Sequence, residues 1–267
     1  MPNQKVIVVF DIDGVVRDVG GSYRRAIADT VEHFTSSAYR PTSEDIDSLK
    51  SEGLWNNDWD ASQELVYRYF ESKSQLRSHL DLDRDALIAF FQSRYRGTNP
   101  ENWTGYICSE PLLLQPAYLE SLTQGAIAWG FFSGAMRDEA LYVLQGKLGL
   151  TSPVLVAMED APGKPDPTGL FATVEQLQSQ QGIDESTPVI YVGDTVADMY
   201  TVEKARKLQP SRVWVGVGIL PPHVQQTQER RESYTTTLIN AGAAMVFSNV
   251  KQLTPVEIEK LAIAYQP

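Results

Sequence analysis

Short apolar runs recur along the chain and alternate with amphipathic segments. These runs lie at residues 5–10, 126–132, 153–158, 188–193, 212–217 and 243–247. Their β-branched and aromatic content is typical of strands buried on both faces of a parallel sheet. Helical patterns lie between most of them. In residues 136–150, for example, Leu141, Leu144 and Leu148 share one face and Gly149 can act as the C-cap. The alternation predicts an α/β fold in which helices cover both faces of a six-stranded parallel sheet.

The segment between the first two runs is too long for a simple crossover helix. It holds more than a hundred residues, whereas a crossover between parallel strands needs only about a dozen. Ser22 can cap a first helix within it, and Thr42 with Asp45 is typical of a capping box at the start of a second. We therefore predict that a small, mainly helical domain is inserted into the sheet domain. The predicted limits are 16–108 for the insertion, and 1–15 with 109–267 for the core.

Composition narrows the range of partners and cellular settings. The chain has 34 acidic and 23 basic residues and a formal net charge of -11, so its surface should repel nucleic acids and anionic membranes. A site that binds phosphate must then obtain positive charge locally. The single Cys108 excludes an intramolecular disulfide, and no apolar stretch approaches the roughly 20 residues that span a bilayer. Since no basic, apolar leader precedes the first strand, we expect a soluble, cytoplasmic protein. The oligomeric state stays open.

Polar residues that suit phosphoryl transfer follow four of the predicted strands. Because the carboxyl ends of parallel strands meet at one edge of a sheet, these residues are expected to converge there. They are Asp11, Asp13 and Gly14 after the first strand, Ser133 and Gly134 after the second, Lys164 after the third and its loop, and Asp194 and Asp198 after the fourth. The sequence therefore predicts one site at this edge.

The acidic residues of this set suit nucleophilic catalysis with a metal ion. A carboxylate can attack phosphorus when positive charge offsets the repulsion between the two anions. Asp11 is expected to be this nucleophile, and Asp13 to act on the leaving group as general acid and then as general base. Mg²⁺ prefers oxygen ligands, here the Asp11 carboxylate, the Asp13 backbone carbonyl and the Asp194 carboxylate. Asp198 either contacts the residues that bind the metal, without binding it directly, or orients Lys164. The first of these roles is favoured.

Other residues of the set can hold the phosphate. The Ser133 hydroxyl and the Gly134 amide precede a predicted helix, whose start is a common place for phosphate oxygens. Lys164 adds a compact positive charge, although Lys147 is an alternative. Gly14 allows the chain to turn away from the strand beside the bound substrate.

Arginines that follow the first motif are candidates for binding an anionic substrate. Arg17, Arg24 and Arg25 come soon after that motif, and an arginine can grip an anion with two parallel hydrogen bonds. Exposed helix arginines are also common on protein surfaces. Position alone favours Arg17.

Together these motifs resemble those of the haloacid dehalogenase superfamily, over nearly the whole chain. DIDGVV is similar to its first motif, FFSG to the second, GKPDP to the third and GDTVAD to the fourth, in the same order. The helical insertion is similar to the C1 cap of subfamily I, which closes over the substrate. The resemblance implies a Rossmann-like core and a Mg²⁺-dependent phosphatase with an aspartyl-phosphate on Asp11. It also implies a small substrate such as a sugar phosphate or phosphoglycolate.

Departures from the family pattern lie near the hinge and in the insertion. Arg17 stands where relatives usually carry an apolar residue, and Val19 replaces a common Ser or Thr. The segment WNNDW at residues 55–59 is also unusual. It is either a substrate-reading element or a capped loop packed by its tryptophans, because Asn and Asp often form turns.

Two alternative functions stay open from sequence. A phosphomutase of the β-phosphoglucomutase type would use the same Asp11 and Asp13 but return the phosphoryl group to a sugar. A binding or regulatory protein could keep the fold without turnover, although a full set of buried charged groups argues against this. Dehalogenase chemistry needs neither Mg²⁺ nor Asp13. Phosphonatase chemistry needs a lysine in the insertion, where Lys50 and Lys73 are the candidates.

Overall fold

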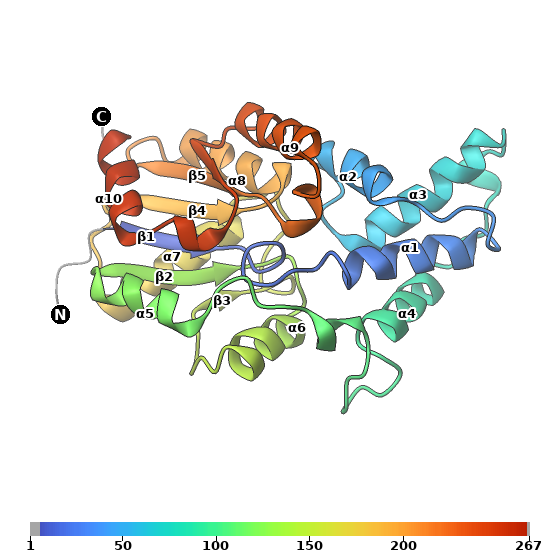
Figure 1. Ribbon diagram of the computed structural model, residues 1–267, viewed down its shortest axis with the longest axis horizontal. Helices are drawn as coiled ribbons and strands as arrows, with labels where there is room; N and C mark the ends of the chain where they lie inside the picture. Colours follow the sequence, from blue (N-terminus) through green and yellow to red (C-terminus); the bar gives the residue numbers. More distant parts are fainter. Residues whose placement is uncertain (1–5, 266–267) are drawn as a thin grey trace. The chain divides into compact units, whose positions relative to one another are not determined.

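The computed structural model describes residues 6–265, which divide into two compact units (Figure 1). The first unit holds the residues up to Asp18 and those from Leu112 onward, and the second is Val19–Pro111. None of the helices in residues 6–265 is long and apolar enough to cross a membrane.

Within the described residues, the first unit is built on a six-stranded sheet. Every pair of neighbouring strands is parallel, and the strand order is β3-β2-β1-β4-β5-β6. The strands are β1 (Val6–Phe10), β2 (Ile127–Phe132), β3 (Leu155–Val156), β4 (Val189–Gly193), β5 (Trp214–Ile219) and β6 (Met245–Phe247). This confirms all six predicted strands, with β3 and β6 shorter than their apolar runs.

Side chains of the central strand β1 alternate between two separate cores. Val8 and Phe10 pack in one cluster with residues of α5 (Pro116–Gln124), η3 (Tyr142–Lys147) and α10 (Pro255–Ala264). Ile7 and Val9 pack in another with residues of α7 (Thr168–Gln181) and α8 (Val196–Leu208). Because successive strand residues point to opposite faces, the continuous apolar run is buried on both sides. The predicted α/β class, with helices on both faces of the sheet, is therefore confirmed.

The helices of the first unit follow the predicted pattern, with one difference. They are α5 (Pro116–Gln124), α6 (Arg137–Leu141), η3 (Tyr142–Lys147), α7 (Thr168–Gln181), α8 (Val196–Leu208), η4 (Pro222–Val224), α9 (Gln228–Asn240), η5 (Val250–Gln252) and α10 (Pro255–Ala264). The sequence predicted one regular helix over residues 136–150. The structure has a short α-helix there that continues as a π-helical turn, η3.

The second unit is helical, as the sequence predicted. Its elements are α1 (Tyr23–Phe34), α2 (Ser43–Ser51), α3 (Asp58–Ser72), η1 (Arg77–His79), α4 (Arg84–Tyr95) and η2 (Tyr106–Ser109). The capping box of Thr42 and Asp45 at the start of α2 is confirmed. Ser22 occupies the N-cap position of α1 but makes no capping bond, because its hydroxyl donates to Glu110 and to the Val19 carbonyl instead.

Two glycines allow the backbone contribution to stability to be measured. Gly182 ends α7 in the left-handed conformation, whereas Gly146 within η3 does not have a positive φ, and an added Cβ would meet no atom within 4 Å at either position. Gly182→Ala should lower the free energy of unfolding by about 1 kcal/mol, because the left-handed conformation strains a residue with a Cβ. Gly146→Ala should leave it unchanged or raise it by up to about 1 kcal/mol. Urea denaturation measures both free energies of unfolding. Equal losses in the two variants would contradict the prediction that the left-handed conformation makes the alanine at position 182 the more destabilising one.

Candidate active site

The strand order places the ends of β1, β2 and β4 side by side. Strands lie on both sides of β1, with β2 on one side and β4 on the other, and ligands of open α/β sheets bind where the order reverses in this way. Asp11 directly follows β1, and its amide donates to the Val192 carbonyl of β4 over 2.8 Å. Ser133 and Asp194 directly follow β2 and β4. Three of the predicted site residues therefore begin loops at one edge of the sheet.

Three carboxylates converge at this edge. One oxygen from each of Asp11, Asp194 and Asp198 lies within 4.8 Å of the others, and all three side chains are buried. The Lys164 ammonium lies 2.8 Å from Asp11 Oδ1 and 2.7 Å from Asp198 Oδ1. The parallel strands thus bring Asp11 close to residues that follow it by more than a hundred positions in the sequence.

Aromatic rings and acidic groups surround Lys164. Its Nζ lies 5.3 Å from the centre of the Phe132 ring and 5.5 Å from that of Tyr191, distances at which a ring face attracts a cation. Lys147, the alternative from sequence, lies on η3 with its Nζ 5.6 Å from the Tyr142 ring. The structure therefore selects Lys164 as the lysine that contacts the carboxylates.

The pKa values of this cluster reflect burial and mutual charge. Burial raises the pKa of Asp11 to about 7; Lys164 opposes this shift, while Asp198 and Asp13 add to it. Burial would lower the pKa of Lys164, but Asp11 and Asp198 outweigh that effect and raise it. For Asp198, burial is outweighed by Lys164 and the Thr195 hydrogen bonds, so its pKa is lowered. The lysine and Asp198 are therefore held in their charged forms.

The charge balance of the cluster fits a divalent cation. Three buried carboxylates lie around one ammonium group, so acidic groups outnumber basic ones in the cluster. Buried charges are costly unless they are paired, and a divalent ion would add positive charge among the carboxylates. Carboxylate oxygens are the ligands that Mg²⁺ prefers. Asp11 and Asp194 could hold such an ion in this structure.

Asp198 is already surrounded by donors. Its Oδ1 accepts hydrogen bonds from Lys164 and from the Tyr191 hydroxyl, and its Oδ2 accepts from the Asp194 amide and from both the amide and the hydroxyl of Thr195. A metal ion would have to displace some of these donors. Asp198 therefore orients both Lys164 and the Asp194 backbone, which fits either of the two roles considered for it and is less suited to direct binding of the metal.

Arg17 binds Asp13 rather than projecting into solvent. The Arg17 side chain is fully buried, and its Nε donates to Asp13 Oδ1 over 2.6 Å. The turn that joins the two residues is closed by hydrogen bonds from the Gly14 amide to the Arg17 carbonyl and from the Arg17 amide to the Ile12 carbonyl. The structure thus gives Arg17 a contact with Asp13 that the sequence did not predict, while its predicted role in binding an anionic substrate stays a prediction.

Gly14 is required by its closeness to Asp194. It adopts a positive φ of +73°, and a Cβ added there would lie 2.0 Å from Asp194 Oδ2. Both the backbone conformation and the space therefore exclude a larger residue. Gly14 allows the first loop to approach the carboxylate that follows β4, which is a structural role beyond the predicted proximity to substrate.

Ser133 and Gly134 offer donors, but not from a helix start. The Ser133 hydroxyl oxygen accepts a hydrogen bond from the Ala135 amide over 3.1 Å. Neither the Ser133 hydroxyl nor the Gly134 amide donates to any described residue. The predicted helix begins only at Arg137, so the expectation that the Gly134 amide belongs to a helix N-terminus is wrong. A serine-centred turn presents these donors instead.

The unusual WNNDW segment forms the start of α3. The Asn57 side chain accepts from the amides of Trp59 and Asp60, which caps the helix, and Asp58 forms an ion pair with Lys50 over 2.9 Å. The geometry favours the capped-loop interpretation of this segment. Lys50, one of the two candidates for the lysine that phosphonatase chemistry would require, is thereby held in an internal ion pair.

Three residues of the site were not predicted from sequence. Thr195 forms a capping box with Asp198 at the start of α8, and Tyr191 donates to Asp198 over 2.9 Å. The Tyr234 hydroxyl, from α9, donates to the Asp194 carbonyl over 3.0 Å. The Thr-x-x-Asp spacing is a recognisable capping signal. Nothing local in the sequence marks either tyrosine, because both contacts depend on the tertiary fold.

Comparisons with known proteins find a match over most of the chain. A family model described as haloacid dehalogenase-like hydrolase matches residues 6–206, which is more than half of the chain. An imidazoleglycerol-phosphate dehydratase from Phytophthora nicotianae is 31% identical over 217 residues; the match covers 80% of this chain but only 43% of that protein. The chain thus spans less than half the length of this relative.

Solved structures share the fold at low identity. A hydrolase from Pseudomonas syringae is similar with a TM-score of 0.59 at 18% identity, covering 97% of this chain and 99% of that one. A phosphatase from Thermococcus thioreducens is similar with a TM-score of 0.58 at 23% identity, covering 80% of this chain and 93% of that one. At these identities the likeness establishes the fold.

Substitution of Gly14 tests whether its closeness to Asp194 shapes a metal site. Gly14→Ala should weaken Mg²⁺ binding about tenfold or more, because the new Cβ would displace the Asp194 carboxylate, one of the groups that could hold the ion. Gly21→Ala, where an added Cβ meets nothing within 4 Å, is the control. Calorimetric titration with Mg²⁺ measures both. Unchanged Mg²⁺ affinity in a folded Gly14→Ala protein would show that the closeness of residue 14 to Asp194 does not shape a metal site.

Proposed function

We propose that this chain, which belongs to the haloacid dehalogenase-like hydrolases, is a Mg²⁺-dependent phosphatase that hydrolyses a small phosphate monoester through an aspartyl-phosphate on Asp11. The observation that carries the proposal is the buried Asp11 carboxylate, which lies at a strand end between Lys164 and the Asp194 carboxylate. A second acid, Asp13, lies two residues away and is held separately by Arg17.

The first half-reaction transfers the phosphoryl group to Asp11. Asp11 Oδ1 accepts hydrogen bonds from Lys164 and from the Ile12 amide, which fixes the carboxylate and leaves Oδ2 for attack. A bond forms from Asp11 to phosphorus while the bond from phosphorus to the ester oxygen breaks. Asp13, in its protonated form, gives its proton to the departing oxygen.

The second half-reaction restores the enzyme. Asp13, now a carboxylate, takes a proton from water as the water oxygen attacks phosphorus, and the bond between phosphorus and Asp11 breaks to release inorganic phosphate. The donors of Ser133 and Gly134 would hold the phosphate oxygens in both steps. Mg²⁺ bound by Asp11 and Asp194, with the Asp13 carbonyl as a further ligand, would offset the repulsion between the carboxylate and the phosphate.

The substrate class is a small phosphorylated metabolite, with sugar phosphates and phosphoglycolate-like compounds as the first choices. The relative from Phytophthora nicotianae carries a phosphorylated imidazole compound in its name. Because this chain matches less than half of that protein, its dehydratase activity is not a basis for assignment. It does add imidazole glycerol phosphate to the compounds worth screening.

A phosphomutase would use the same residues, so the two activities must be separated by the acceptor. The mutase alternative predicts that glucose 1,6-bisphosphate raises the conversion of β-glucose 1-phosphate to glucose 6-phosphate. The phosphatase proposal predicts that inorganic phosphate is released at an equal or greater rate from the same substrate. A binding protein without turnover would show neither product.

Variants of the two acids test the assigned roles. With p-nitrophenyl phosphate and Mg²⁺, Asp11→Asn should reduce kcat to below about one thousandth, because a carboxamide cannot act as the nucleophile. Asp13→Asn should reduce kcat by about a hundredfold or more, the usual contribution of a general acid. EDTA should abolish turnover. Initial rates of phosphate release provide the measurement.

The control for these acids is Asp81→Asn, an exposed carboxylate of the second unit. It should keep the wild-type rate. Robust Mg²⁺-dependent turnover by Asp11→Asn would overturn the nucleophile assignment.

Arg17 variants distinguish a positioning role from substrate binding. Arg17→Met should lower kcat by about tenfold to a hundredfold with little change in KM, because an unheld Asp13 is misaligned for proton transfer. Arg17→Lys should recover part of the loss, since an ammonium can still pair with Asp13. A large rise in KM with unchanged kcat would instead show that Arg17 contacts the substrate. Circular dichroism should first confirm that each variant is folded.

A further inference from the structure

The Lys164 ammonium depends on tertiary contacts for its position. A lysine carries its charge at the end of a flexible four-carbon chain with three donors, and Lys164 comes from the loop between β3 and α7. Two of the donors meet the Asp11 and Asp198 carboxylates, and the third meets no acceptor among the residues that the structure describes. The groups that surround the ammonium must therefore hold it in place.

Tyr191 supplies two of these surrounding groups from one side chain. It lies in the middle of β4, on the same face of the sheet as Phe132 of β2, and the two buried rings have centres 6.1 Å apart. The centre of the Tyr191 ring lies 5.5 Å from Lys164 Nζ. Its hydroxyl donates over 2.9 Å to Asp198 Oδ1, the same oxygen that accepts from Lys164. Tyr191 therefore reaches both the ammonium and a carboxylate that pairs with it.

The hydroxyl distinguishes Tyr191 from the apolar residues around it. Ile7, Val9 and Val189 pack in the same core cluster, and a buried hydroxyl costs free energy unless it is hydrogen-bonded. Burial and the Asp198 carboxylate raise the pKa of Tyr191 well above its usual value, so the hydroxyl keeps its proton and acts as a donor. An Asp198 carboxylate that rotated away would lose this bond. The hydroxyl thus restrains the oxygen that Lys164 contacts.

We propose that Tyr191 is a positioning residue for Lys164, which it holds against Asp11 through its ring and through the bond from its hydroxyl to Asp198. At this distance the ring face attracts the ammonium. The consequence for the reaction rests on the function proposed above, because a displaced lysine would leave the Asp11 nucleophile misaligned. The position of the ammonium itself can be measured without turnover.

NMR of the lysine ammonium groups in isotopically labelled protein provides that measurement. A buried, paired ammonium should exchange its protons slowly with water, and its signal is identified by its absence in Lys164→Arg. In Tyr191→Phe, which keeps the ring, these protons should exchange about tenfold faster, because a hydrogen bond to a charged group is lost. In Tyr191→Leu the signal should also shift, because the ring beside the ammonium is gone. An unchanged signal in both variants would overturn the proposal.

A double-mutant cycle tests the consequence for the reaction. Tyr191→Phe should lower kcat for p-nitrophenyl phosphate about tenfold, but by less than about twofold in Lys164→Met, because a residue that acts through another has little effect in its absence. Calorimetric titration of Tyr191→Phe should show unchanged Mg²⁺ affinity. Equal losses of kcat in both backgrounds, or an equally large loss of Mg²⁺ affinity, would overturn the proposal.

The two measurements separate this proposal from the proposed function. A wild-type chain that releases no phosphate would contradict the phosphatase function, and the NMR comparison would then decide the role of Tyr191 alone. The same comparison decides it if Lys164→Met has no measurable rate or does not fold.

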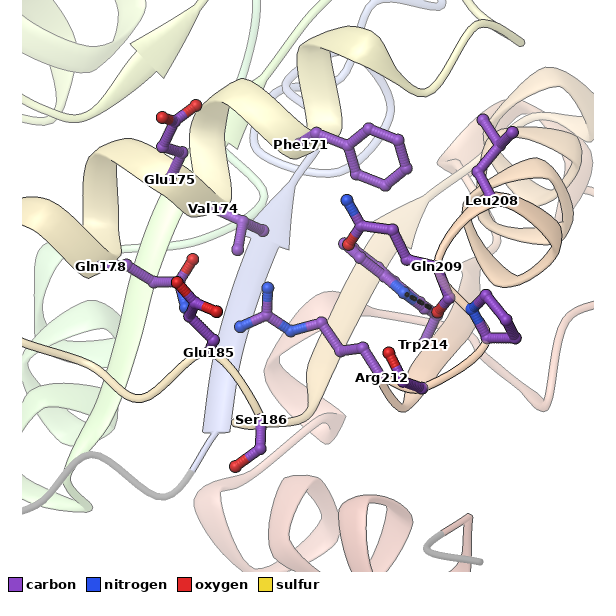
Figure 2. Close-up of a pocket in the computed structure, with 12 residues that line it drawn as sticks. Phe171, Val174, Glu175, Gln178, Glu185, Ser186, Leu208, Gln209, Arg212 and Trp214 are labelled. Carbon is purple, nitrogen blue, oxygen red and sulfur yellow. Dashed lines mark hydrogen bonds between the residues drawn. The ribbon is translucent and has the colours of Figure 1, made fainter.

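Two variants of the first unit serve as controls. Tyr200→Phe removes a hydroxyl from an exposed position of α8. Phe171→Leu removes a ring that lines another cavity, about 670 Å³ in volume, where it meets the Trp214 ring (Figure 2). No residue of the carboxylate cluster lines that cavity. Both controls should keep the Lys164 signal and the wild-type kcat, and changes as large as those in the Tyr191 variants would overturn the proposal.

Discussion

The Lys164 ammonium, held between the Asp11 and Asp198 carboxylates, is the interaction on which the site depends. A buried ion pair is costly to break, by about 3–5 kcal/mol when one partner is removed. Here it joins the loops that follow three strands, because Asp11 follows β1, Asp198 opens α8 after β4, and Lys164 comes from the loop after β3. The parallel sheet brings these loops together, and the ion pairs then fix their side chains relative to one another. The same contacts therefore arrange the side chains for chemistry and pair their buried charges.

The two acids of the first loop are supported in different ways. Asp11 is deep in the cluster, where burial and neighbouring carboxylates raise its pKa and Lys164 opposes that effect. Asp13 is instead held by Arg17 within a tight turn. This separation allows two carboxylates only two residues apart to take different roles, a common solution in active sites. A divalent cation bound by Asp11 would add positive charge to the cluster.

Sequence predicted most of the fold and that Asp11, Lys164 and Asp194 would meet at one edge of the sheet, for physical reasons that are visible in the chain. Uninterrupted apolar runs are distinctive of buried parallel strands, and polar residues that follow them must meet at one edge, so Asp11 could be located without a structure. The contacts that sequence did not predict have different causes. The contact of Arg17 with Asp13 depends on the turn of the first loop, Gly134 was assigned to a helix that begins later, and Tyr191 is indistinguishable from other strand residues. Helix caps are also difficult to predict from sequence. The Ser22 hydroxyl, for example, donates to Glu110, which is distant in the sequence, instead of capping its helix.

The most direct test of the account is to look for the phosphoryl group on Asp11 during turnover. The protein would be mixed with Mg²⁺ and a rapidly hydrolysed phosphate ester, quenched in acid within the first turnover, digested and examined by peptide mass spectrometry. The account predicts one added phosphoryl group on the peptide that contains Asp11, located to that residue by fragmentation and lost in Asp11→Asn. Steady hydrolysis with no phosphoryl group on this peptide, or with the group on another residue, would contradict it.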